Sequence, residues 1–270
     1  MPEAAVPDLD AEADRALLIA AAEAAGPIAM KFWRTEIEAM HKPGDLGPVT
    51  EADLAINRML EAELGSARPG YGWLSEESED NPKRLEAERI FIIDPIDGTR
   101  SFIAGEQGFS VALAIAHRGV VTAAAVHLPA RMETFSAALG GGAHKNGFPI
   151  AASERAELSD ATVLTARKQL DDMHWPGGVP PLKRHFRSSL AWRLCLVAEG
   201  RFDTMLTFRQ AFEWDIAAGA LIAAEAGANV TDGDGGRLVF NAPDALHPGI
   251  IAAPDALHGA ILAHRQPDQV

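Results

Sequence analysis

The chain has 270 residues, of which 47% are hydrophobic, and its 24 basic and 38 acidic side chains give a formal net charge of −14. This length suits one large domain or two small ones. The acidity argues against a nucleic acid polymer or an anionic membrane surface as an electrostatic partner, because both select basic surfaces. The single cysteine, Cys195, excludes an intramolecular disulfide and gives no sign of a thiolate metal cluster.

The first predicted element is a helix that begins at Asp10, a candidate N-cap, and reaches the break at Gly26-Pro27. The apolar pattern resumes from Ile28 to Ile37, so the helix is expected to continue with a kink at Pro27. The N-terminus is acidic, unlike a secretory signal, and no apolar run approaches the roughly 18 residues of a membrane span. A soluble, cytoplasmic protein is therefore expected, with no membrane span.

A turn-rich stretch at 41–48 precedes a second predicted helix, at whose start Thr50 and Asp53 have the spacing of a capping box. Short apolar runs separated by turn signals then predict strands of an antiparallel sheet. These runs are 89–94, 109–116, 120–128 and 132–139. The glycine-rich segment 140–147 is predicted to be a loop.

Beyond residue 150 the pattern changes, because strand-like and helix-like segments alternate. Such alternation favours an α/β arrangement. We therefore predict two domains, an N-terminal α+β domain at 1–150 that binds metal and a C-terminal α/β domain at 151–270 that completes the site.

The hexapeptide DPIDGT at 94–99 directly follows an apolar run, so it places two carboxylates three residues apart at the edge of a sheet. Mg²⁺ uses few carboxylates and takes water and phosphate oxygens as well. The backbone N–H groups of Gly98 and Thr99 can face an anion. This turn therefore offers a metal side and a phosphate side. The alternative is an ordinary turn in which Asp94 or Asp97 caps a helix.

Asp215 precedes a helix-like segment rich in small residues and, taken alone, is most simply interpreted as an N-cap. Four segments nevertheless form one ordered pattern: VTEAD (49–53), WLSEES (73–78), IIDPIDGTRSF (92–102) and WDIAAGALIAAEAG (214–227). The pattern resembles the inositol monophosphatase family of metal-dependent, lithium-sensitive phosphatases. The resemblance implies an α/β fold of the sugar-phosphatase type, a layered αβαβα sandwich with an antiparallel N-terminal sheet and a smaller C-terminal α/β part.

The resemblance also assigns roles to residues at matching positions. The metal ligands would be Glu76, Asp94, Ile96 through its carbonyl, Asp97 and Asp215. Asp53, Thr99 and Glu76 would activate the attacking water. Gly98 and Thr99 would bind phosphate, and Glu77 would lie in an outer shell or at a third metal. The family further implies a homodimer and two or three Mg²⁺ ions, with Mn²⁺ as a substitute and Li⁺ and Ca²⁺ as inhibitors.

The substrate is expected to be a small phosphate monoester. Inositol monophosphatases place a glutamate several residues before the WD motif, where this chain has Thr207 or Phe208. The basic segment 182–193 and Arg100 would suit a second phosphate, and we expect Arg187 and Ser189 to contact it. These features favour the 3′(2′),5′-bisphosphate nucleotidase branch.

Several alternatives stay open at this stage. The basic segment is equally well explained as a solvated face. An inositol or other polyol phosphate is the second substrate candidate, followed by fructose-1,6-bisphosphate and histidinol phosphate. A non-catalytic binding module on the same fold is the alternative from another functional class.

Overall fold

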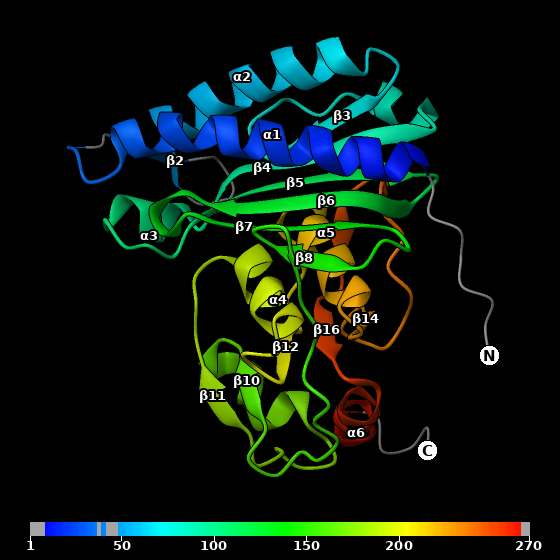
Figure 1. Cartoon of the computed structure of the whole chain (residues 1–270). Coiled ribbons are helices and arrows are strands. Elements are labelled where there is room, and N and C mark those ends of the chain that lie inside the picture. Colours follow the sequence, from blue (N-terminus) through cyan, green and yellow to red (C-terminus); the bar gives the residue numbers. More distant parts are fainter. Residues whose placement is uncertain (1–8, 37–38, 42–47, 266–270) are drawn as a thin grey trace.

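Layers of helices alternate with two β-sheets through the molecule (Figure 1). The computed structural model describes residues 9–36, 39–41 and 48–265. Its helices are α1 (Leu9–Phe32), α2 (Glu51–Ala67), α3 (Thr99–Ile103), α4 (Leu190–Ala198), α5 (Glu213–Glu225) and α6 (Asp255–Arg265). Helices α1 and α2 cover one face of a seven-stranded sheet, α4 and α5 lie between the two sheets, and α6 packs against the second sheet. The predicted αβαβα sandwich is confirmed.

The seven-stranded sheet lies entirely before residue 150 and has the order β3-β4-β5-β6-β7-β8-β9. Its strands are β3 (Gly72–Ser75), β4 (Arg89–Asp97), β5 (Ser110–His117), β6 (Val120–Leu128), β7 (Glu133–Ala138), β8 (Ala143–Lys145) and β9 (Phe148–Pro149). Strand β3 is parallel to β4, and all other neighbours are antiparallel. The sheet is buried on both faces, which explains why its central strands are nearly continuous apolar runs.

The second sheet is mixed and has the order β11-β10-β12-β16-β14. Its strands are β10 (Thr162–Leu164), β11 (Lys183–His185), β12 (Thr204–Thr207), β14 (Asn229–Thr231) and β16 (Ile250–Ala253). Two short pairs complete the strands, β1 (Ala39–His41) with β2 (Pro48–Thr50) and β13 (Ala211–Phe212) with β15 (Leu246–His247). Single 3₁₀ turns are η2 (Pro82–Glu86), η3 (Pro129–Arg131), η4 (Arg167–Leu170) and η5 (Asp172–His174).

Three hydrophobic clusters fill the spaces between the layers. The central cluster is the one that positions the site, because it joins the two sheets through α4 and α5. A Cβ at Gly219 of α5 would stand 2.7 Å from the Cβ of Leu194 on α4. Only glycine therefore allows these two helices to approach as closely as they do.

Two predicted boundaries are wrong, the end of the strand at Asp94 and the start of the helix at Asp215. Strand β4 does not end at Asp94 but runs to Asp97, with an irregular register between the two aspartates. Pro95 has no N–H group for the ladder, so a local break in pairing replaces the predicted turn. Helix α5 begins at Glu213, whose N–H donates to the carbonyl of Ala245. Asp215 therefore lies in the first turn and is not the N-cap.

Three further boundaries differ from prediction. Helix α1 continues through Pro27 as expected but ends at Phe32, where a turn with Arg34 at φ 62° stops it. Asp10 lies in its first turn and is not its cap. The predicted loop 140–147 contains strand β8. Most of the turn-rich stretch 41–48 lies outside the described residues.

Candidate metal centre and active site

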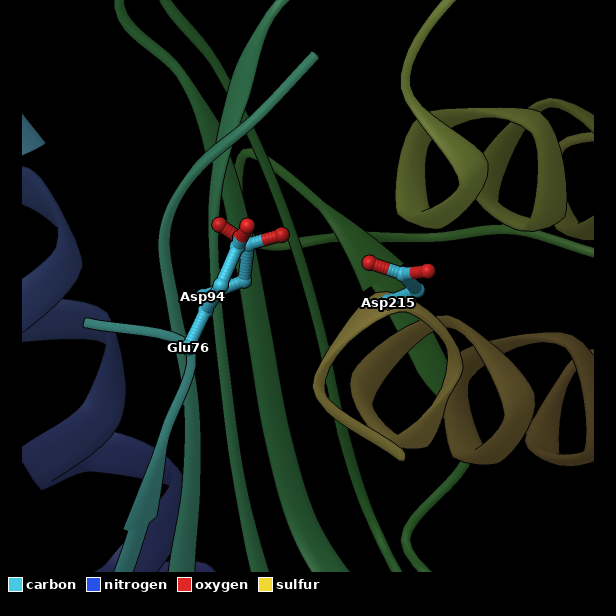
Figure 2. A group of neighbouring side chains, drawn as sticks. All are labelled: Glu76, Asp94 and Asp215. Atoms are coloured by element: carbon cyan, nitrogen blue, oxygen red, sulfur yellow. The ribbon is translucent and has the colours of Figure 1, made fainter. Parts of the chain in front are cut away.

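Three carboxylates, Glu76, Asp94 and Asp215, converge between the two sheets and form the acidic group. Oxygen atoms of Glu76, Asp94 and Asp215 all lie within 4.8 Å of one another. Figure 2 shows Glu76 and Asp94 side by side, with Asp215 facing them from the first turn of α5. Parallel pairing of β3 with β4 explains the first two positions, because it sets Ser75 opposite Ile93 and brings the residues that follow to one edge.

Burial makes this arrangement costly without a cation. Asp94 is 1% exposed, and its Oδ1 atom is buried with no hydrogen-bond partner among the described residues. Burial raises the pKa of Asp94 well above its usual range, and the neighbouring carboxylates, Glu76 first, raise it further. Burial likewise raises the pKa of Asp215, with added repulsion from Asp97 and Glu76. An orphaned carboxylate oxygen in an all-oxygen set fits a hard divalent cation.

Asp97 lies near this group but outside it. Its Oδ2 accepts hydrogen bonds from the Ser189 hydroxyl at 2.6 Å and from the Ala191 N–H at 2.7 Å, at the start of α4. Burial raises the pKa of Asp97 to about 6, while these hydrogen bonds oppose the rise. Asp97 thus joins the seven-stranded sheet to α4, across the boundary between the predicted domains.

Ser189 is fully buried, which differs from its expected contact with substrate. As the N-cap of α4 it accepts from the Trp192 N–H at 2.9 Å, and its hydroxyl also lies 3.0 Å from the Ser110 hydroxyl. With its hydrogen bond to Asp97, these contacts use the hydroxyl within the protein. Ser189 therefore holds α4 and Asp97 in place rather than facing a ligand.

The DGT turn is shaped by a glycine. Gly98 has φ 93° and is the N-cap of α3, and a Cβ there would stand 2.8 Å from the carbonyl oxygen of Gly108. The Thr99 hydroxyl donates to the carbonyl of Ile96 at 3.0 Å. That carbonyl keeps a second lone pair, so it can still ligate a cation.

Asp53 forms the predicted capping box. The Thr50 N–H donates to Asp53 Oδ2 at 2.9 Å, and Thr50 is the N-cap of α2. Asp53 is fully buried, and its charge is among those that raise the pKa of Asp94. Helix α3, which begins at Thr99, packs against β2, which ends at Thr50. Asp53, in the first turn of α2, therefore lies three residues beyond a strand that α3 contacts.

Asn57 is a residue that sequence reasoning missed. It lies one turn after Asp53 on α2, accepts from the Ser75 hydroxyl at 2.7 Å and donates to the Ser78 hydroxyl at 3.0 Å. The N–H of Glu77 donates to Ser75 as well, at 3.3 Å. These bonds fix both ends of the Glu76-Glu77 pair. The signal in the sequence was its position four residues after Asp53, which places both side chains on the same face of the helix.

The basic segment divides into structural and accessible parts. Arg193 is buried, and its guanidinium donates to the carbonyls of Arg187 and Ser188. Lys183 forms an ion pair with Asp160 at 3.1 Å. Arg187 is half-buried and lines a cavity of about 310 Å³ between α3 and the start of α4.

Two other arginines are exposed, and one of them acts on the acidic group. Arg100 follows Thr99 and is exposed. Arg209, which the sequence analysis did not single out, is also exposed, and its positive charge opposes the rise in the pKa of Asp215. Its position six residues before Asp215 was the only signal in the sequence.

Within the described part of the chain, no helix has both the length and the hydropathy needed to cross a membrane.

The sequence model of the inositol monophosphatase family matches residues 10–269. The chain is 36% identical to an inositol-1-monophosphatase of Rhizobium meliloti (strain 1021) over 198 residues, which cover 70% of this chain and 73% of the relative. It is 32% identical to a histidinol-phosphatase of Chlorobaculum parvum over 258 residues, which cover 89% and 96%.

Among solved structures, the fold is similar to that of the extragenic suppressor protein suhB from Bartonella henselae. The two share a TM-score of 0.81 and 27% identity, over 95% of this chain and 99% of the other. The family match and this structural likeness span both sheets and the acidic group between them.

Proposed function

The chain belongs to the inositol monophosphatase family and is a phosphomonoesterase, and on that premise we propose that it hydrolyses a 3′(2′),5′-bisphosphate nucleotide. The reaction would remove the 3′-phosphate from a compound such as 3′-phosphoadenosine 5′-phosphate and leave AMP. Water supplies the oxygen that the phosphate gains, and the sugar oxygen leaves with a proton.

Mg²⁺ is the proposed cofactor, because the donor set is all oxygen and contains an orphaned buried carboxylate atom. The residues that would hold it are Glu76, Asp94, the Ile96 carbonyl, Asp97 and Asp215, with Glu77 in an outer position or at a third ion. When bound, Mg²⁺ neutralises phosphate charge and lowers the pKa of a bound water. Asp97 would exchange part of its contact with α4 for this role.

The chain's own residues then orient the reactants. Asp53 and Thr99 are proposed to position the attacking water and accept its proton, with Glu76 beside them. The contact of α3 with β2, the strand directly before α2, supports this pairing. Backbone N–H groups at Gly98 and Thr99 are proposed to hold the phosphate. Gly98 has no Cβ, so it can adopt the left-handed conformation that shapes this turn. Phosphoryl transfer depends mainly on such positioning and charge stabilisation.

The observation that carries the substrate class is the charge around the acidic group. Thr207 and Phe208 have no carboxylate to bind inositol hydroxyls, and both are packed in the protein, Thr207 at 2% exposure and Phe208 against Trp175. Arg209 is exposed and close enough for its positive charge to oppose the rise in the pKa of Asp215, and Arg100 is exposed directly after Thr99. A second, non-reacting phosphate provides a partner for such guanidinium groups.

A polyol phosphate such as inositol-1-phosphate is the second candidate. The relative from Rhizobium meliloti carries the name inositol-1-monophosphatase, which favours this substrate. The relative from Chlorobaculum parvum carries the name histidinol-phosphatase, which favours histidinol phosphate in the same way.

A phosphate-release panel tests the proposal. The purified chain is assayed with Mg²⁺ on 3′-phosphoadenosine 5′-phosphate, inositol-1-phosphate, histidinol phosphate and fructose-1,6-bisphosphate, each with and without Li⁺ or Ca²⁺, and with Mn²⁺ in place of Mg²⁺. We expect the highest kcat/KM on the bisphosphate nucleotide, with inhibition by Li⁺ and Ca²⁺. A preference for inositol-1-phosphate would replace the first candidate by the second, and no Mg²⁺-dependent release from any ester would contradict both.

A further inference from the structure

Glu213 is a buried acid to which the proposed reaction gives no role. It is the first residue of α5, two positions before Asp215, and it is fully buried. Its carboxylate accepts from the N–H of Asn241 at 2.7 Å and from the N–H of Ala242 at 2.8 Å, one on each oxygen. Its own N–H donates to the Ala245 carbonyl at 2.9 Å. The first turn of α5 is thus fastened to the segment 241–245.

Arg84 fastens the connection between β3 and β4 to the same segment. It lies in η2, eight residues after Glu76, and is 3% exposed. Its guanidinium donates to Asn241 Oδ1 at 2.7 Å and to the carbonyls of Ala242 and Pro243 at 3.0 and 3.2 Å. The Asn241 side chain donates back to the Arg84 carbonyl at 3.1 Å.

One guanidinium serves two carboxylates in this arrangement. Arg84 makes a two-point contact with Asp80, through Nε at 2.6 Å and Nη2 at 3.1 Å. Burial raises the pKa of Glu213, while the two backbone N–H groups and the positive charge of Arg84 oppose the rise. A buried carboxylate held by two backbone donors and a nearby guanidinium is stable in place.

These bonds link the helix that carries Asp215 to the connection between β3 and β4. Arg84 lies in η2, between the two strands that position Glu76 and Asp94, and it is bonded to the same segment 241–245 as Glu213. Glu76, Asp94 and Asp215 bring carboxylate oxygens within 4.8 Å of one another from a sheet and a helix, so a framework is needed to hold the helix in place against the sheet.

We infer that Glu213, together with Arg84 and Asn241, is a positioning residue that holds Asp215 in place relative to the seven-stranded sheet for metal binding. The inference rests on the proposed metal role of Asp215. Groups that orient metal ligands typically contribute about 10- to 100-fold to metal affinity. Loss of the framework should therefore weaken metal binding before it affects the global fold.

The test compares Glu213→Gln with Glu225→Gln. Glu225 lies at the other end of α5 and accepts from the N–H groups of Gly140 and Gly142, both at 2.9 Å, so it makes the same kind of contact far from the acidic group. Mn²⁺ binding is measured directly by calorimetry on both variants and the parent, with Tm measured in chelator. We expect Glu213→Gln to weaken Mn²⁺ binding by about tenfold or more and Glu225→Gln to leave it within about twofold.

A merely structural role would lower Tm in both variants and leave Mn²⁺ affinity unchanged, and that result would overturn the inference. If Glu213→Gln does not fold, Asn241→Gly replaces it, because Asn241 has φ 65° and glycine tolerates this conformation. It removes both side-chain bonds to Arg84 and should also weaken Mn²⁺ binding. Direct binding needs no turnover, so it separates this inference from the phosphatase proposal: a parent that binds Mn²⁺ but releases no phosphate fails only the latter.

Discussion

The two sides of the acidic group differ in what they present. The side formed by the seven-stranded sheet supplies carboxylates from neighbouring strands, with Glu76 after β3 and Asp94 within β4. The other side supplies one carboxylate from a helix, Asp215, and the exposed cation of Arg209. Strand pairing fixes the first set to the register of a sheet, whereas the second depends on how a helix and its preceding segment are placed. We therefore expect the carboxylates of the sheet side to determine whether phosphate is released at all, and the helix side to determine which substrate is preferred.

Removing a sheet-side carboxylate should have the largest effect. Asp94→Asn keeps the shape of the buried side chain but removes the charge in the middle of the group. We expect kcat for phosphate release to fall by about 10²- to 10³-fold or more, as when a single electrostatic stabiliser of a transition state is lost. Circular dichroism should show an unchanged fold. Phosphate release close to the parental rate would contradict the assigned metal site.

Removing a helix-side cation should change selectivity instead of the reaction itself. We expect Arg209→Gln to raise KM for 3′-phosphoadenosine 5′-phosphate by about tenfold, equivalent to about 1.4 kcal/mol, with little change in kcat. KM for inositol-1-phosphate should hardly change, because that substrate has one phosphate. Arg237→Gln, which alters another exposed arginine, is the control. Equal effects on both substrates would remove the distinction between the two sides.

The pH dependence of the metal-free protein should give the smallest effect. Asp97 has a pKa of about 6 in the fold against 3.8 as its ordinary value, and the pKa of Asp94 is raised in the same direction. The folded state therefore holds protons that the unfolded chain has released, and stability is lost as pH rises through this window. We expect the Tm of Asp94→Asn in chelator to exceed that of the parent by a few degrees at pH 7.5.

This difference should shrink toward pH 5, where protonation already relieves the repulsion in the parent. Burial lowers the pKa of His127, His247 and His258, and their protonation also changes stability in acid, but it contributes equally to both proteins. Added Mg²⁺ should raise the Tm of the parent alone. A Tm gap that is constant with pH would show that the carboxylates do not repel as described.

The sequence predicted most of what depends on local pattern. Short-range signals specified the capping box at Thr50 and the strands that became β4 to β7, because each needs only neighbouring residues. The layered fold followed from the family resemblance, which the comparisons confirm. The homodimer and the cytoplasmic location stay predictions.

Long-range contacts could not be predicted in this way. Ser189 resembled a substrate contact in sequence, yet its hydroxyl is used by Asp97, which lies 92 residues earlier. Glu213 looked unimportant because its partners at Asn241 and Ala242 lie on a segment without a motif. Arg209 becomes relevant only when the fold brings it beside Asp215. Each of these roles is set by packing between distant segments.

The contact of Asp97 with α4 couples the proposed metal site to the segment that precedes α4. The same carboxylate that is proposed to take part in metal binding holds the first turn of α4, directly after the half-buried Arg187 and Ser188. An ion that binds Asp97 would therefore change how the segment carrying Arg187 is held. By thermodynamic reciprocity, a ligand that binds this segment and depends on that contact would change the affinity for the ion by the same factor. A single shared side chain would then make the two binding events cooperative.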